Sequence, residues 1–249
     1  MKIIEYGEEN SEVIILLHGG GLSWWNYREE ANLLKETYHV VLPVLDGHAD
    51  SDTPFTTIEE NAKELISYID KNFQGTVLAI GGLSLGGQIL VEMLSQRSDI
   101  CKCAVIESAL VIPMGLTSAL IAPTFGMSYG LIKKSWFSKL QFRSLKIWAD
   151  LFQDYYRDTC KIEKHDMIRF LKSNSSYTIK PGLANTTAKA IILVGGKEQK
   201  KMRRSAEILH RTINDSKLQI LDHYYHGELS LNHPRDYTEL LNSLVIVSH

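Results

Sequence analysis

The stretch AIGGLSLGGQIL, residues 79–90, joins an apolar run to a helix-forming run through glycines on both sides of Ser84. The run before it is typical of a strand buried on both faces, and QILVEMLSQR after it has apolar residues at helical spacing. Side chains at Gly82 and Gly86 would collide where such a strand and helix pass close to each other. The stretch therefore predicts a sharp strand–turn–helix unit that presents the Ser84 hydroxyl. It also puts the Leu85 amide at a helix N-terminus, where an amide can bind developing negative charge.

Short apolar runs of this kind recur along the chain, and helical patterns separate most of them. The predicted strands cover residues 13–17, 38–45, 75–82, 101–107, 189–196 and 216–223. The clearest helical stretch follows Thr57, which can cap it, and Glu60 is placed to return a hydrogen bond to the cap. This alternation predicts the α/β class, with a doubly wound, mostly parallel sheet between layers of helices.

Residues 111–185 interrupt the alternation. They contain no convincing strand and are rich in Trp, Phe, Tyr, Met and Leu, which favours several short helices inserted between two strands of the sheet. We therefore expect a core domain made of residues 1–110 and 186–249 and a helical cap subdomain of residues 111–185. A chain of 249 residues is long enough for one large domain with such an insert.

The formal net charge of −2 gives no electrostatic reason to expect nucleic acid or an anionic membrane as a partner. The three cysteines, Cys101, Cys103 and Cys160, have neither metal-ligand spacing nor the pattern of a secreted disulfide framework. The first residues carry no basic-then-apolar signal, and no apolar run is long enough to span a bilayer. We expect a cytoplasmic protein that acts on a small molecule, without a metal, and we make no prediction of its oligomeric state.

A serine at a tight turn acts as a nucleophile only if amide donors, a base and an acid lie nearby. The alternative is a glycine-rich turn in which Ser84 merely caps the helix. The sequence HGGG, from His18 to Gly21, ends an early buried strand. Glycines there allow backbone amides to approach a substrate oxygen without a side chain in the way. His18 itself is expected to make structural hydrogen bonds within this loop.

Three histidines near the end of the chain are candidates for the base. His226, followed by Gly227, lies in the loop after the last predicted strand, where an imidazole could reach the turn at Ser84. His223 follows the apolar run directly and is expected at the strand end, whereas His233 precedes a proline that starts the final helix. We therefore favour His226.

Two glutamates are candidates for the acid that orients this imidazole. Glu198 lies just after the predicted strand 189–196, at the carboxyl end of the sheet, where open α/β sheets carry their sites. Glu107 is the alternative acid, because a carboxylate at the end of an earlier strand could reach the same imidazole from another direction. Asp222 lies too close to the histidine loop to be as plausible.

Taken together, HGGG, GLSLGG, GGKE and HGELSLNHP resemble the α/β-hydrolase superfamily, which has the same chain order of nucleophile, acid and histidine. The stretch PVLDGHADSDTP, residues 43–54, resembles a loop that follows a core strand in that superfamily. The resemblance implies the α/β-hydrolase fold with an inserted cap, with Ser84 as nucleophile, His226 as base and Glu198 as acid, and no cofactor. It implies an oxyanion hole formed by the backbone amides of Leu85, Gly20 and Gly21.

The implied function is a serine hydrolase that cleaves a small, apolar carboxylic ester or thioester through an acyl-enzyme intermediate. The aromatic residues of the insert favour an apolar pocket, and Trp24 and Trp25, next to the HGGG loop, are expected to line it. An aminopeptidase-like amide hydrolase and a carbon–carbon bond hydrolase are alternatives on the same residues. A non-catalytic ligand-binding protein of the same fold is a further alternative. The serine argues against the epoxide hydrolase and haloalkane dehalogenase branches, which attack with aspartate.

Overall fold

The structure is a computed structural model that describes residues 1–247, and the side chains of all of these except 116, 117 and 126–128. Seven strands form one sheet in the order β1-β3-β2-β4-β5-β6-β7. Strand β1 runs antiparallel to β3, and all other pairs are parallel. The strands are β1 (Lys2–Tyr6), β2 (Val13–Leu17), β3 (His39–Val44), β4 (Val77–Leu83), β5 (Cys101–Glu107), β6 (Lys189–Gly195) and β7 (Ser216–Leu221).

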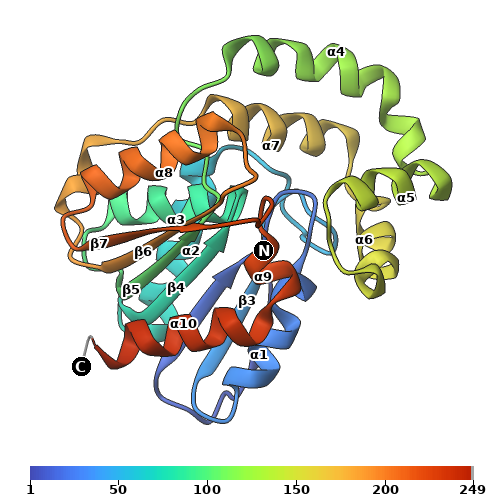
Figure 1. Cartoon of the computed structure of the whole chain (residues 1–249). Helices are drawn as coiled ribbons and strands as arrows, with labels where there is room; N and C mark the ends of the chain where they lie inside the picture. Colours follow the sequence, from blue (N-terminus) through green and yellow to red (C-terminus); the bar gives the residue numbers. More distant parts are fainter. Residues whose placement is uncertain (248–249) are drawn as a thin grey trace.

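Helices cover both faces of this sheet, as Figure 1 shows. Helices α2, α3 and α8 pack on one face, and α1 and α10 pack on the other. Their bounds are α1 (Arg28–Leu34), α2 (Ile58–Phe73), α3 (Leu85–Gln96), α8 (Lys200–Thr212) and α10 (Pro234–Ile246). The predicted doubly wound, mostly parallel α/β architecture is confirmed.

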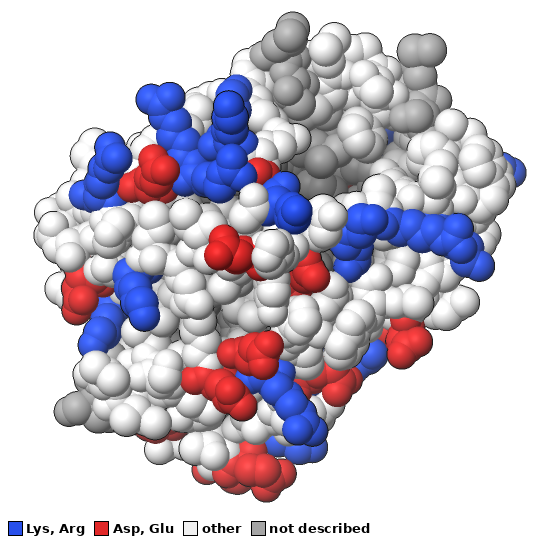
Figure 2. Space-filling model, in the orientation of Figure 1, with Lys and Arg blue, Asp and Glu red and all other residues white. Residues whose placement is uncertain are grey.

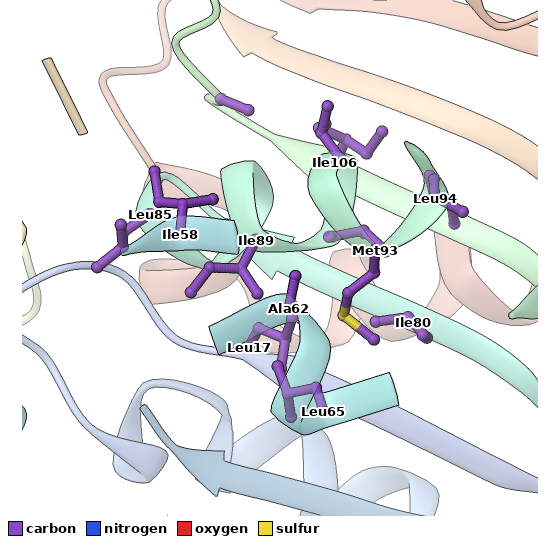
Figure 3. Packing of buried hydrophobic residues seen from close by; sticks show 14 of the residues in the cluster. Leu17, Ile58, Ala62, Leu65, Ile80, Leu85, Ile89, Met93, Leu94 and Ile106 are labelled. Atoms are coloured by element: carbon purple, nitrogen blue, oxygen red, sulfur yellow. The ribbon is translucent and has the colours of Figure 1, made fainter. Parts of the chain in front are cut away.

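The apolar runs of the strands form a core layer on each side of the sheet, because successive side chains point to opposite faces. In β2, Ile15 and Leu17 belong to the layer under α2 and α3, while Ile14 and Leu16 belong to the layer under α1 and α10. Figure 3 shows Leu17, Ile80 and Ile106 of the strands next to apolar side chains of α2 and α3. These fully buried strands fix the sheet edge where the candidate site lies.

All six predicted strands are present, and β1 was not predicted. It is a short edge strand whose residues are mostly only partly buried, so it lacks the continuous apolar run that marks the others. The predicted cap of α2 is confirmed, since Thr57 Oγ1 accepts a hydrogen bond from the Glu60 amide at 3.1 Å. The Glu60 carboxylate lies 3.9 Å from Lys63 Nζ rather than returning the bond to the cap.

Residues 111–185 are helical in the structure. They contain α4 (Gly115–Ile132), α5 (Ser135–Ser144), α6 (Phe152–Thr159), α7 (Lys164–Ser176) and the short turns η2 (Ala149–Leu151) and η3 (Pro181–Asn185). Figure 1 shows α4 to α7 gathered beyond one end of the sheet, with α4 outermost. Their separation into a cap subdomain stays a prediction. None of the helices within residues 1–247 has the length and apolar character needed to cross a bilayer.

Candidate active site

The turn at Ser84 has the strained geometry expected of a nucleophile elbow. Strand β4 ends at Leu83 and α3 begins at Leu85, so that a single residue reverses the chain. Ser84 has φ 54° and ψ −110°, a conformation that residues with a side chain rarely adopt. Its amide donates a hydrogen bond to the carbonyl oxygen of Glu107, at the end of β5, at 2.8 Å. That bond ties the turn to the neighbouring strand.

Glycines make this turn possible by letting the backbone of α3 lie close to β2 and β4. A Cβ atom at Gly86 would overlap the carbonyl oxygen of Leu17, and one at Gly82 would lie 2.5 Å from the carbonyl oxygen of Gly86. Both obstacles are backbone atoms, which cannot move aside as the end of a flexible side chain can. The steric role predicted for Gly82 and Gly86 is therefore confirmed.

We expect Gly86→Ala to lower the free energy of unfolding by about 3 kcal/mol, because the added methyl group forces α3 away from β2. Gly130→Ala is the matched control, since among the described residues no atom outside the backbone of α4 lies within 4 Å of a Cβ built at Gly130. This control should be as stable as the native protein or more stable by about 0.5–1 kcal/mol. Urea unfolding measures both. Equal stabilities for the two variants would contradict the steric argument.

The structure brings His226 and Glu198 together. His226 lies in the loop between β7 and α9 (Glu228–Asn232), and its Nδ1 donates a hydrogen bond of 2.6 Å to Glu198 Oε2. The other carboxylate oxygen accepts bonds from Ser108 Oγ and from the Gly195 amide, each at 2.7 Å. Burial by itself would raise the pKa of Glu198, but the bonds and charge of His226 and the bonds from Ser108 and Gly195 lower it below its usual value. The arrangement therefore favours the ionised carboxylate.

Ser108 is a part of the site that sequence reasoning missed. It follows β5 directly, has φ 54°, and is buried. Besides donating to Glu198, its Oγ accepts a hydrogen bond from the amide of Gly227, the residue after His226, at 3.4 Å. The available signal was its position, because a polar residue just after a central parallel strand lies at the same sheet edge as Ser84.

Ser84 and His226 both line the same two cavities, of about 260 and 210 Å³. Apolar residues form much of both walls. In the first cavity these are Leu110, Met114 and Met202, and in the second they are Leu22, Leu83, Leu145, Ile147 and Leu231. Lys201 and Asn174 also line the first cavity, and Lys197 and Tyr225 the second. A molecule bound at Ser84 could therefore place one end in each cavity, and both ends would contact mainly apolar side chains.

Gly20 of the HGGG loop lines the second cavity and lies next to Leu85. A Cβ atom at Gly20 would be 3.5 Å from the Leu85 Cβ. Leu85 is the first residue of α3, where an amide has no acceptor within the helix. Gly21 differs from the expectation, because its amide donates to His48 Nε2 at 3.0 Å. The Gly21 amide is therefore already used in a structural hydrogen bond, and the amides of Gly20 and Leu85 remain as the candidate oxyanion donors.

Two buried histidines hold this loop. His18 Nε2 accepts from the Leu45 amide at 3.0 Å, and its Nδ1 lies 2.9 Å from the Gly19 carbonyl oxygen, which fits the structural role expected for it. Burial lowers the pKa of His48 to about 4, so its ring is neutral near pH 7 and can accept the Gly21 bond. The ring also stacks on Phe170 of α7 at a centroid distance of 4.7 Å.

The prediction that Trp25 lines the pocket is wrong, and the structure does not place Trp24 in the wall of either cavity at Ser84. Both belong to the short turn η1 (Trp24–Tyr27), and neither lines either cavity at Ser84. Trp25 is only 1% exposed, and its Nε1 donates to Asp158 Oδ2 at 2.9 Å. Trp24 packs against the same apolar cluster. The Trp25 ring is therefore directed into the core and toward α6 rather than toward the cavities.

Among the described residues, Glu107 makes no hydrogen bond to the His226 imidazole, although the His226 charge acts on it. Its Oε1 accepts a hydrogen bond from the Leu229 amide at 3.2 Å, and its side chain is buried near Tyr27 and Tyr237. Ser230 lies beside this carboxylate and, by hydrogen bonding to its charged form, opposes part of the effect of burial on the Glu107 pKa. Burial raises the pKa of Glu107 to about 7. Glu198, and not Glu107, is the carboxylate that the structure pairs with His226.

The pKa of Glu107 in the folded protein lies above its value of about 4.3 in the unfolded chain, so the folded state binds the proton more tightly. This difference adds to the free energy of unfolding, and its full contribution is present below about pH 4.3. This contribution is lost as the pH rises through 7. Glu107→Gln stays neutral at every pH, so we expect it to gain stability relative to the native protein between pH 5 and pH 8, by at most about 3 kcal/mol. Urea unfolding at the two pH values tests this. A stability difference that does not change with pH would contradict it.

Within the part of the chain that the structure describes, no group of three or more His, Cys, Asp or Glu side chains could hold a metal ion. The chemistry that the geometry offers is that of a hydroxyl, an imidazole–carboxylate pair and free backbone amides at one sheet edge. This set suits attack on a carbonyl group followed by stabilisation of an oxyanion.

Comparison with known proteins agrees with this fold. A family model described as "Alpha/beta hydrolase family" matches residues 14–240. Among solved structures, the chain resembles an esterase from Exiguobacterium antarcticum, with 21% identity, a TM-score of 0.81, and coverage of 98% of this chain and 94% of that one. It also resembles a thermophilic esterase from Thermogutta terrifontis, with 16% identity, a TM-score of 0.77, and coverage of 100% and 93%. Likeness at these identities shows the fold.

A curated relative is the "Soluble epoxide hydrolase" of Corynebacterium sp. (strain C12). It is 28% identical to this chain over 92 residues, which are 35% of this chain and 31% of the relative. The match therefore spans about a third of that relative's length.

Proposed function

Because this chain belongs to the alpha/beta hydrolase family, we propose that it is a serine hydrolase that cleaves a small carboxylic ester or thioester through an acyl-enzyme intermediate. One observation carries the proposal. Ser84, at the strained turn, lines the same two cavities as His226, whose Nδ1 is bonded to Glu198.

In the proposed reaction, Ser84 Oγ attacks the carbonyl carbon while His226 Nε2 takes the hydroxyl proton. Glu198 holds the tautomer with a proton on Nδ1 and stabilises the imidazolium that forms. The amides of Gly20 and Leu85 donate to the oxyanion. His226 then returns its proton to the leaving alcohol or thiol, and the acyl group stays on Ser84. A water molecule, deprotonated by His226, attacks the acyl group, releases the acid and restores the serine.

The cavities support a small and mainly apolar substrate. Each holds only about 210–260 Å³, and leucine, isoleucine and methionine form much of their walls. Short acyl and alcohol groups fit these volumes, whereas a long chain would have to extend outside. The proposed reaction uses only side chains and backbone amides of this chain together with water.

The epoxide hydrolase named in the comparison is not the function we propose. The epoxide hydrolase branch attacks with aspartate, and the elbow of this chain carries Ser84 in that position. A serine hydroxyl activated by an imidazole fits attack on an acyl carbonyl.

A substrate panel and a covalent probe test the proposal together. We expect hydrolysis of short p-nitrophenyl esters or of short thioesters, faster than hydrolysis of aminoacyl p-nitroanilides. A fluorophosphonate should inactivate the protein and be found by peptide mass spectrometry on Ser84. Turnover of anilides alone would favour the amide hydrolase alternative. Binding of a ligand with neither turnover nor labelling of Ser84 would overturn the enzyme assignment.

A further inference from the structure

The stretch KKSWFSKLQFRSLKIW, from Lys133 to Trp148, is strongly basic within a chain whose net charge is −2. We call it the 133–148 segment. It contains no acidic residue, and its cations are Lys133, Lys134, Lys139, Arg143 and Lys146. No ion pair within 4.0 Å joins any of these five cations to a carboxylate in the described part of the chain. Lys133, Lys139 and Lys146 each lie over an aromatic ring, at 5.2, 5.7 and 5.7 Å from its centroid. These contacts do not neutralise the charge, which can still attract an anionic partner.

The same segment exposes large apolar side chains. Trp136 is 65% exposed, Leu140 is 62% exposed and Trp148 is 51% exposed. Trp136 and Leu140 are four residues apart in α5 and so lie on one face of the helix. Next to this helix, α4 has no charged residue in its sequence and exposes Leu120 and Leu131. Exposed apolar groups collected in one region mark an interaction surface.

This surface adjoins the candidate active site. A groove of about 590 Å³ is lined by the cations Lys139 and Arg143, by apolar residues that include Phe142 and Ile147, and by one carboxylate, that of Asp150. Ile147 also lines the smaller cavity at Ser84. Figure 2 shows basic side chains in a band beside α5, on the side of the molecule where Figure 1 shows α4, α5 and α6. Two cations, several apolar side chains and a single carboxylate therefore line one opening next to the candidate site.

The positive charge of the 133–148 segment distinguishes between possible partners. A symmetric contact between two copies of this surface would bring two sets of unpaired cations together, which opposes a dimer through this face. Exposed aliphatic side chains such as Leu140 match lipid acyl chains, tryptophan suits the headgroup level, and lysine and arginine match anionic headgroups. The overall charge of −2 argued against a membrane partner, but screening confines each charge's effect to its neighbourhood, so the local charge decides.

We propose that the 133–148 segment docks the protein on the surface of an anionic lipid bilayer. Trp136 and Leu140 enter the boundary between headgroups and acyl chains, and Lys139 and Arg143 bind the headgroups. The docking does not depend on the proposed chemistry, so Ser84→Ala should bind vesicles as the native protein does. Loss of hydrolysis and loss of docking are thus separate results.

Vesicle co-sedimentation tests the docking. The full chain should sediment with vesicles of phosphatidylglycerol mixed with phosphatidylcholine, and not with phosphatidylcholine alone. Binding should weaken as salt is added, and tryptophan emission should shift to shorter wavelength on binding. Failure to bind the anionic vesicles at low salt would overturn the proposal.

Matched variants locate the surface. Lys139→Glu/Arg143→Glu should weaken binding at least about tenfold, and Trp136→Ser/Leu140→Ser should weaken it and abolish most of the emission shift. Lys200→Glu/Arg204→Glu is the control, since it makes the same charge change on α8, where no large apolar side chain is exposed. It should bind nearly as the native protein does. An equal loss in the α8 variant, or native binding by either α5 variant, would overturn the proposal. A dimer that Trp136→Ser/Leu140→Ser disrupts, without vesicle binding, would show that a second copy is the partner instead.

Discussion

Ser84→Ala is expected to lower kcat for short ester substrates by about 10⁶-fold, which leaves only the acceleration from binding and the amide donors. Alanine removes the attacking oxygen and keeps the backbone, so the turn at φ 54° is retained. Steady-state hydrolysis of p-nitrophenyl esters measures the loss, and the unfolding free energy verifies that the variant is folded.

Ser67→Ala is the matched serine control for this experiment. Ser67 is exposed on α2, and its hydroxyl donates to the carbonyl oxygen of Lys63 in the preceding helical turn. We expect native kcat and KM for this variant. If Ser84→Ala kept activity within tenfold of the native protein, the hydrolysis would have another nucleophile.

The second large effect concerns the acid. Glu198→Gln should lower kcat by about 10⁴-fold, because an amide can donate to His226 Nδ1 and so favours the wrong tautomer, and it cannot stabilise the imidazolium. Glu107→Gln should lower kcat by no more than about tenfold, because that side chain bonds to the Leu229 amide and not to the imidazole.

The two glutamine variants are compared under one assay, with kcat measured across pH. Both replace a buried carboxylate with a neutral side chain of the same shape, so each controls for the other. A larger loss of kcat in Glu107→Gln would show that Glu107 is the acid and would contradict the pairing seen between His226 and Glu198.

The sequence predicted those parts of the molecule that are determined by residues close together in the chain. Buried strands were found from continuous apolar runs, and the turn at Ser84 was found because Gly82 and Gly86 are needed wherever a helix packs back on its strand. Glu198 and His226 were selected as candidates because each follows a strand at the carboxyl edge of the sheet. The structure places these two side chains in contact.

The parts that sequence reasoning missed depend on contacts between distant residues. Trp25 points away from the cavities because its indole bonds to Asp158, 133 positions along the chain. The Gly21 amide is occupied by His48, which follows a different strand. No local pattern encodes either bond, since each depends on how separate loops pack. Net charge carries a different limit, because the value of −2 averages the basic 133–148 segment with an acidic remainder and so does not describe the local charge.

The end of β5 has a consequence for how the site tolerates change. Glu107 binds the amide of Ser84 through its carbonyl oxygen, and Ser108 contacts both Glu198 and the amide after His226. The loops that carry Ser84, Glu198 and His226 are thus all bonded to the end of β5. A substitution that shifts the end of β5 moves these three side chains together and preserves their mutual spacing. The same shift misaligns them with the Gly20 amide, which lies in a loop bonded elsewhere. Such damage would leave the serine reactive toward small probes and impair turnover of carbonyl substrates.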